Sequence, residues 1–255
     1  MNANSQSEIQ KLVSAEEWQL RVDLARCYRL VAPYGWSDLV FTHISARIPG
    51  PEHHFLINPY GLGFDEVTAS NLVKIEADGE VVGQQQYQAN KAGFIIHSAV
   101  HMAREDAACV FHTHTLAGMA VSAQEEGLLP VHMYSHNFWN RLSYHDFEGP
   151  SMRLEERDRL TKSLGSNQAL ILRNHGLLTL GRTIPEAFLL HWRLNRACEI
   201  QLAAQGAKLR IPSKEVCEQS LQMGDEFLND AAPMGELEFA SFKRIIDSQD
   251  ASYKN

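Results

Sequence analysis

Apolar residues recur at helical spacing in two long segments of the chain. After Ser14 they occupy every third or fourth position up to Pro33, and after Thr183 the same spacing continues to Gly206. Ser14 and Thr183 each precede a glutamate by three positions, which is the capping-box pattern of a helix start. The sequence therefore predicts a long helix after each of these two residues.

Shorter apolar runs between the two segments predict a sheet with further helices. Predicted strands cover residues 39–48, 53–58 and 107–114, with two more about a turn in 169–181 and a hairpin about Asp78-Gly79 in 73–83. Predicted helices cover residues 92–104, 115–126 and 155–164, and Thr68 is expected to cap a short one. The short connections favour antiparallel pairing.

The length of 255 residues is near the size at which one hydrophobic core stops growing, and we expect one large domain. Residues 1–14 are expected to form a flexible N-terminus, residues 15–212 the domain itself, and residues 213–255 a helical extension. That extension is acidic: it holds nine acidic and four basic residues. Pro212 and the change in composition after it mark the boundary.

Charge and hydropathy exclude several classes of partner. The net charge of −8 provides no general attraction for nucleic acid or an anionic membrane surface. No apolar run approaches the roughly 18–20 residues that cross a bilayer, and the first ten residues lack a signal-peptide pattern. We therefore expect a cytoplasmic protein. Its four cysteines are widely spaced and are expected to be buried thiols.

Three of the twelve histidines have a spacing that suggests a metal site. His112 and His114 flank one residue of a predicted strand, which places both imidazoles on the same face. His175 lies in the turn between two apolar strands, where a side chain is exposed at a sheet end. Three imidazoles leave coordination positions open for substrate or water, as in catalytic zinc sites. The alternative is that each is a hydrogen-bonded histidine of the sheet.

Other patterns carry less chemistry. His97 and His101 are four residues apart on a predicted helix, and we interpret them as polar positions of a helix face because no third ligand is nearby in the sequence. The chain has no Walker loop, no GxSxG elbow, no HExxH and no GxGxxG after a strand. Nucleotide binding and the commonest hydrolase mechanisms therefore have no support.

Seven segments, in order, resemble the class II aldolase and adducin head domain family, and they are more similar to its adducin-like branch. They are GWSDLVFTHISARIP, FLINPYGLGFDEVTASNLVKI, KAGFIIHSAVHMARED, ACVFHTHT, AVSAQEEGLLP, YHDFEG and LILRNHGLLTLGRTIPEAF. The resemblance implies a three-layer α/β/α fold around a mainly antiparallel sheet, and a homotetramer. It also implies a divalent metal on His112, His114 and His175. Zinc is the expected ion, with manganese or another divalent ion as the alternative.

The sequence departs from the family's aldolases at the positions that handle substrate. Their catalytic carboxylate is replaced by Gly93, and the two serines before it by Lys91 and Ala92. An asparagine of their phosphate site is replaced by His43, whereas Gly61 keeps a glycine of that site. We therefore expect His43, Gly61 and Lys91 to contact substrate, with Lys91 able to attract a carboxylate.

Two functions are consistent with these residues. The first is a metal-dependent carbon–carbon lyase, of decarboxylase or aldolase type, that acts on a small keto or hydroxy acid through a metal-stabilised enolate. Decarboxylation is favoured because it needs no base for a hydroxyl proton. The candidate proton carriers are Glu66, His97, Tyr134 and His136. The alternative is a non-catalytic, adducin-like binding or scaffold module.

Overall fold

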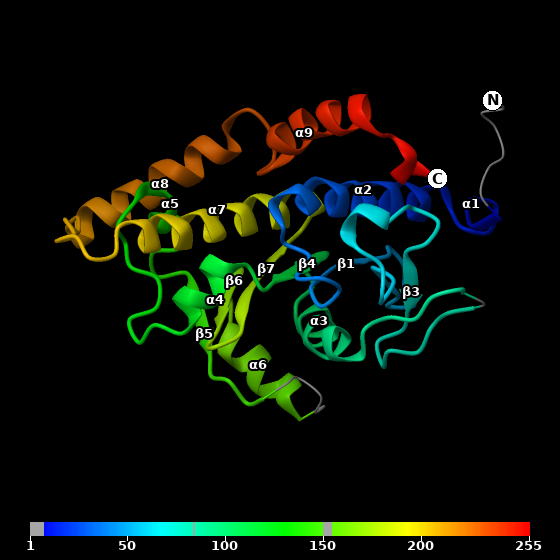
Figure 1. Cartoon of the computed structure of the whole chain (residues 1–255), viewed down its shortest axis with the longest axis horizontal. Coiled ribbons are helices and arrows are strands. Elements are labelled where there is room, and N and C mark those ends of the chain that lie inside the picture. The colour runs from blue at the N-terminus through cyan, green and yellow to red at the C-terminus, as the bar shows by residue number, and fades with distance from the viewer. Residues whose placement is uncertain (1–7, 84, 150–154) are drawn as a thin grey trace.

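The computed structural model describes residues 8–83, 85–149 and 155–255, and its centre is a seven-stranded sheet in the order β3-β2-β1-β4-β7-β6-β5 (Figure 1). The strands are β1 (His43–Arg47), β2 (Phe55–Ile57), β3 (Val73–Ile75), β4 (Cys109–Thr113), β5 (Leu142–His145), β6 (Ala169–Leu172) and β7 (Gly176–Gly181). All neighbouring strands are antiparallel except β5 and β6, which are parallel. The predicted mainly antiparallel sheet is confirmed.

Helices cover both faces of this sheet and form the predicted three-layer α/β/α arrangement (Figure 1). The helices are α1 (Glu8–Leu12), α2 (Ala15–Val31), α3 (Lys91–Ala103), α4 (Leu116–Ser122), α5 (Met133–His136), α6 (Glu156–Leu164), α7 (Ile184–Ala203), α8 (Lys214–Asp230) and α9 (Glu236–Gln249). One face packs against α2, α4 and α7, and the other against α3 and α6. On the outer side, α9 packs on α2 and α7. No described helix is long and apolar enough to cross a membrane.

Side chains of the central strand β4 enter apolar clusters on both faces of the sheet. Cys109 and Phe111 point into the cluster formed with α2 and α7, whereas Val110 points into the cluster formed with α3 and α6. Side chains alternate along a strand, so His112 lies on the α3 side with Val110. The alternation therefore fixes which face of the sheet carries this histidine.

Both long predicted helices are present, and their N-caps are those expected. Ser14 Oγ accepts a hydrogen bond from the Glu17 amide at 3.1 Å, and Thr183 caps α7 in the same way. The carboxylate of Glu17, however, does not complete a capping box. It bonds Arg21 at 3.0 Å and Lys74 at 2.8 Å, because burial favours pairing the charge with these cations.

Three local predictions are wrong. Residues 39–41 form a turn and not the start of a strand, because Asp38 and Leu39 adopt positive φ angles of 40° and 59°. Thr68 caps a turn through the Asn71 amide and starts no helix. The second half of the predicted 73–83 hairpin is reduced to a single bridge between Ile75 and Val81.

Candidate metal centre

Three imidazoles converge where β4 and β7 meet. His112 is the fourth residue of the fully buried strand β4, His114 follows that strand, and His175 lies in the β6–β7 turn. Their Nε2 atoms are close: 3.0 Å separates those of His112 and His114, and 3.0 Å those of His114 and His175. One ligand atom from each histidine lies within 4.8 Å of the others. The structure thus brings together the three residues that the sequence singled out.

The outer nitrogens of two of these rings are anchored. His112 Nδ1 donates to the Leu177 carbonyl at 2.9 Å, and His114 Nδ1 donates to Asp38 Oδ2 at 2.8 Å. A neutral imidazole carries one N–H, so both Nε2 atoms present lone pairs to the centre. Such anchoring of the outer nitrogen is typical of histidines that bind metals.

The donor set fits a divalent ion. Facing lone pairs at 3.0 Å repel each other unless a proton or a cation lies between them. Burial lowers the pKa of His175 to about 4 and that of His112 well below its usual value, which opposes the protonated alternative at neutral pH. Two imidazoles bound to zinc in tetrahedral geometry would have nitrogens about 3.3 Å apart, close to the distances observed.

Local backbone geometry places His175 at the centre. Asn174 adopts φ +55°, a conformation that asparagine tolerates, and this closes the three-residue turn between β6 and β7. Gly176 follows, and a Cβ there would lie 2.4 Å from the carbonyl oxygen of Thr113. The glycine therefore lets β7 approach the backbone at Thr113, the residue between His112 and His114.

Asp38 is a residue of the centre that the sequence analysis missed. Its carboxylate reaches His114 from the turn after α2, where it adopts φ +40°. We expect Asp38→Asn to weaken metal binding about 10- to 100-fold, because the amide no longer offers a charged acceptor to the ligand. Equilibrium metal titration measures the change. Asp65→Asn, at an exposed carboxylate, is the control, and equal affinities in both variants would contradict the role of Asp38.

His97 and His101 do not join the metal centre, as the sequence analysis expected. Both are buried and bond Ser45 Oγ, each at 2.6 Å. His97 also contacts His43, and the ring centroid of His43 lies 5.1 Å from that of His112. Among the predicted substrate and proton-carrying residues, His43 therefore lies directly beside the triad and His97 lies behind it.

No described contact joins the other candidate proton carriers to the triad. Glu66 is exposed and accepts the Gly63 amide at 2.8 Å. Tyr134 packs edge-on against Trp192 of α7, with ring centroids 5.6 Å apart. His136 bonds Ser220 of α8. The catalytic roles predicted for these three residues stay predictions.

Two of the predicted substrate contacts, Gly61 and Lys91, stay predictions. Gly61 is exposed with φ +97°, and a Cβ at this position would meet no atom within 4 Å. Its positive φ accounts for the glycine. Lys91 is the first residue of α3, but its side chain lies outside the described part of the structure.

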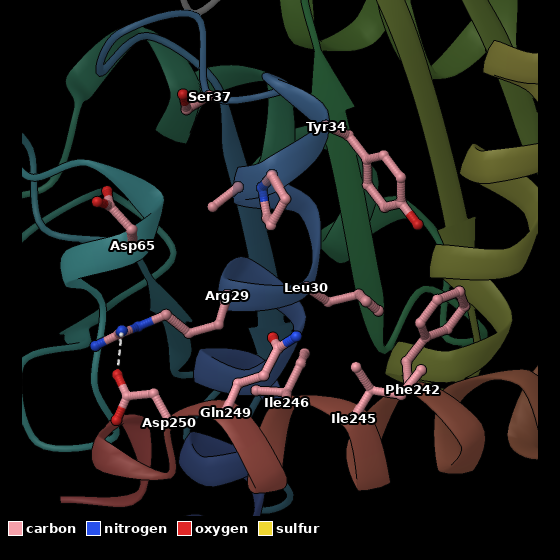
Figure 2. A pocket seen from close by; sticks show the side chains of 12 residues that line it. Arg29, Leu30, Tyr34, Ser37, Asp65, Phe242, Ile245, Ile246, Gln249 and Asp250 are labelled. Carbon is pink, nitrogen blue, oxygen red and sulfur yellow. Dashed lines mark hydrogen bonds and ion pairs between the residues drawn. The ribbon is translucent and has the colours of Figure 1, made fainter.

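A separate groove of 650 Å³ lies between the end of α2 and α9 (Figure 2). Leu30, Tyr34 and Phe242 supply apolar walls, and Arg29 pairs with Asp250 at 3.2 Å. The residues that line this groove include none of the three histidines. The histidine centre and this groove are therefore separate parts of the structure.

Comparisons with known proteins identify the family of the chain. Residues 22–202 match the profile of the class II aldolase and adducin N-terminal domain. A candidate class 2 aldolase of Pseudomonas aeruginosa is 48% identical over 97% of this chain and 96% of its own. Rat alpha-adducin is 40% identical over 90% of this chain, which spans only 33% of the adducin.

Two solved structures with similar sequences have the same fold. An aldolase II superfamily protein from Pseudomonas syringae superposes with a TM-score of 0.92 at 43% identity, over 98% of this chain and all of the other. An L-fuculose 1-phosphate aldolase from Glaciozyma antarctica gives 0.82 at 27% identity, over 100% and 97% of the two chains. With a profile match over more than half of its length and these relatives, the chain belongs to the class II aldolase and adducin N-terminal domain family.

Proposed function

We propose that this chain is a metal-dependent carbon–carbon lyase that acts on a small keto or hydroxy acid. The observation that carries the proposal is the convergence of three imidazole lone pairs, two of them fixed by acceptors on the outer nitrogen. His112, His114 and His175 would hold a divalent ion, zinc in our proposal, which would supply a Lewis acid for a substrate carbonyl and for the negative charge that develops beside it. A catalytic role also explains why coordination positions are left open.

The protein's own residues then have separate tasks. His112, His114 and His175 hold the ion, and Asp38 keeps His114 in the tautomer that can bind it. Burial favours neutral imidazoles over imidazolium ions, which keeps the nitrogens available at neutral pH. Lys91, at the start of α3, attracts the substrate carboxylate by charge in this proposal.

Sugar phosphates are not the substrate we propose, although three structural neighbours are named as L-fuculose 1-phosphate aldolases. The family's carboxylate and serines are replaced here by Gly93, Lys91 and Ala92. General-base catalysis is typically worth roughly 10²–10⁴ in rate, so only slow residual cleavage of fuculose- or rhamnulose-type phosphates is expected. A coupled aldehyde assay measures it; efficient metal-dependent cleavage would contradict the substrate class.

The proposal is tested with a panel of small keto and hydroxy acids. Protein loaded with zinc or manganese is incubated with each acid, and released carbon dioxide and aldehyde are both measured. We expect turnover of at least one acid that stops on chelation, with carbon dioxide as the commoner product. Metal-loaded protein that converts no member of the panel would favour the scaffold function.

The scaffold function is the second candidate because of the adducin relatives. This chain matches rat alpha-adducin at 40% identity but spans one third of it. A scaffold has no need for open metal positions, although a metal can stabilise a fold. The scaffold function predicts two results together. The metal-loaded protein shows no turnover, and it unfolds at a higher temperature than the metal-free form.

A homotetramer forms part of the proposal. Three exposed apolar side chains lie next to residues of the centre. Leu39, which follows Asp38, is 76% exposed, and Leu116, two residues after His114, is 81% exposed. The ring centroid of Phe147 lies 6.3 Å from that of His175. Such an apolar rim is typical of surfaces that bind another protein. Sedimentation at micromolar concentration is expected to give four times 28.7 kDa, and a monomer would contradict the assembly.

A further inference from the structure

A continuous chain of buried polar groups connects the metal centre to the backbone beyond α3. His43 Nδ1 contacts His97 Nε2 at 2.8 Å, and His97 Nδ1 contacts Ser45 Oγ at 2.6 Å. Ser45 Oγ contacts His101 Nε2 at 2.6 Å, and His101 Nδ1 contacts the Ala107 carbonyl at 2.7 Å. All four side chains are at most 3% exposed. This set, which we call the His43 chain, has one end at a carbonyl and the other beside the triad.

The carbonyl end fixes the direction of every hydrogen bond. A carbonyl only accepts, so His101 carries its proton on Nδ1 and offers a lone pair at Nε2. Ser45 has one hydroxyl proton and must donate it to that lone pair. Ser45 Oγ is then the acceptor for His97, which carries its proton on Nδ1. By the same argument His97 Nε2 accepts from His43 Nδ1, and His43 Nε2 is left with a lone pair.

This argument requires neutral imidazoles, and their surroundings favour that state. Burial lowers the pKa of His101 to about 3 and that of His97 well below its usual value, and His43 is itself only 3% exposed. At neutral pH a single arrangement of protons therefore satisfies the chain.

The free edge of the His43 ring lies against the start of α3. A Cβ at Gly93 would be 2.3 Å from His43 Nε2 and 2.3 Å from its Cδ2. Among the described side chains, none donates to this Nε2 atom. The ring thus fills the space next to the residue at which the family resemblance places a carboxylate, and it does so beside His112, its partner in the β1–β4 register.

We propose that His43 Nε2 accepts a hydrogen bond from the substrate next to the metal, and that the chain ending at Ala107 holds it in this tautomer. The inference rests on the proposed function, because it assumes a small hydroxy or keto acid, or its enol, at the triad. In this assignment Ser45, His97 and His101 are positioning residues that do not touch the substrate. Gly93 is the residue that makes room for the ring.

The tautomers are measured on the wild-type protein by two-bond ¹H–¹⁵N correlation with labelled histidine, before any substrate is added. We expect a protonated Nδ1 and an unprotonated Nε2 at His43, His97 and His101. An Nε2–H tautomer at His43 overturns the proposal. This measurement does not depend on turnover, so it stands whether or not the acid panel finds a substrate.

Pyruvate is then added as the probe to the metal-loaded protein. We expect the Nε2 resonance of His43 to shift together with those of the triad histidines. A His43 resonance that stays unchanged while the triad responds overturns the substrate contact alone. No response at any histidine, together with no turnover in the panel, counts against the proposed function as well.

Breaking the chain provides a third readout. Ser45→Ala removes the link between His97 and His101, so His43 is expected to populate both tautomers and its shift on pyruvate addition to be reduced. Thr179→Val is the matched control, because it removes a hydroxyl that contacts the buried His191 at 3.0 Å outside the chain. An unchanged His43 tautomer in folded Ser45→Ala protein overturns the positioning role.

Discussion

His112→Ala is expected to lower the affinity for a divalent ion by at least about 100-fold. Loss of a residue that hydrogen-bonds the outer nitrogen of a ligand typically lowers metal affinity about 10- to 100-fold. Loss of the ligand itself removes one of the three donor atoms and is expected to lower it further. His112 is the most buried of the three: it is 1% exposed, and its Nδ1 donates to the Leu177 carbonyl. Elemental analysis after dialysis and a competition titration with a chelator measure the loss.

His53→Ala is the control for this experiment, because it removes an exposed imidazole from a loop. It should retain the metal content of the wild type. His175→Ala is expected to behave like His112→Ala, because both remove one ligand of the same ion. If both triad variants keep the wild-type metal content, the assignment of the centre is wrong.

Gly93→Ala is expected to destabilise the protein by about 1–3 kcal/mol, the usual cost of overpacking a core. The added Cβ would lie 2.3 Å from the ring of His43, which is 3% exposed and is held at Nδ1 by His97. Neither group can move without breaking a buried hydrogen bond. Gly93→Glu meets the same obstacle, so the carboxylate of the family's aldolases does not fit while His43 is in place.

The double-mutant cycle with His43→Ala isolates this contact. In the His43→Ala background, Gly93→Ala should leave the free energy of unfolding unchanged or raise it, because alanine is a better helix former than glycine by about 1 kcal/mol. The coupling energy should therefore reach about 1–4 kcal/mol, as measured from urea unfolding midpoints. Gly224→Ala in α8 is the control, since its Cβ would meet only the side-chain amide of Asn137. An equal cost of Gly93→Ala in both backgrounds would contradict the contact.

Sequence patterns were sufficient for the long helices α2 and α7, for strands β4, β6 and β7, and for the triad, because these depend on local spacing. They gave no prediction of β5 or α5. The HxH pair lies on one face of a strand whatever the strand pairs with, and an apolar run on each side of Arg173-Asn174-His175 predicts a turn. The ends of elements were less accurate. The strand predicted from Leu39 begins at His43, because the backbone at Asp38 and Leu39 is left-handed.

The rest of the centre depends on register and on contacts between distant segments. His43 lies beside His112 because β1 pairs with β4 in one register, and a shift of one residue would turn its ring to the opposite face. Asp38 reaches His114 across 76 residues of sequence. A single sequence contains no signal for contacts between segments so far apart. The sequence therefore showed Gly93 only as the loss of a carboxylate, whereas in the structure the ring of His43 lies where a side chain at position 93 would be.

The most direct test of the account is the exchange of substrate protons with solvent. Enolate formation at the triad predicts that metal-loaded protein incorporates deuterium from heavy water at C3 of pyruvate or another small 2-keto acid. The exchange should stop on chelation and in His114→Ala, and continue in His53→Ala. Fully metal-loaded wild-type protein that exchanges no proton of any keto acid in the panel would contradict the account.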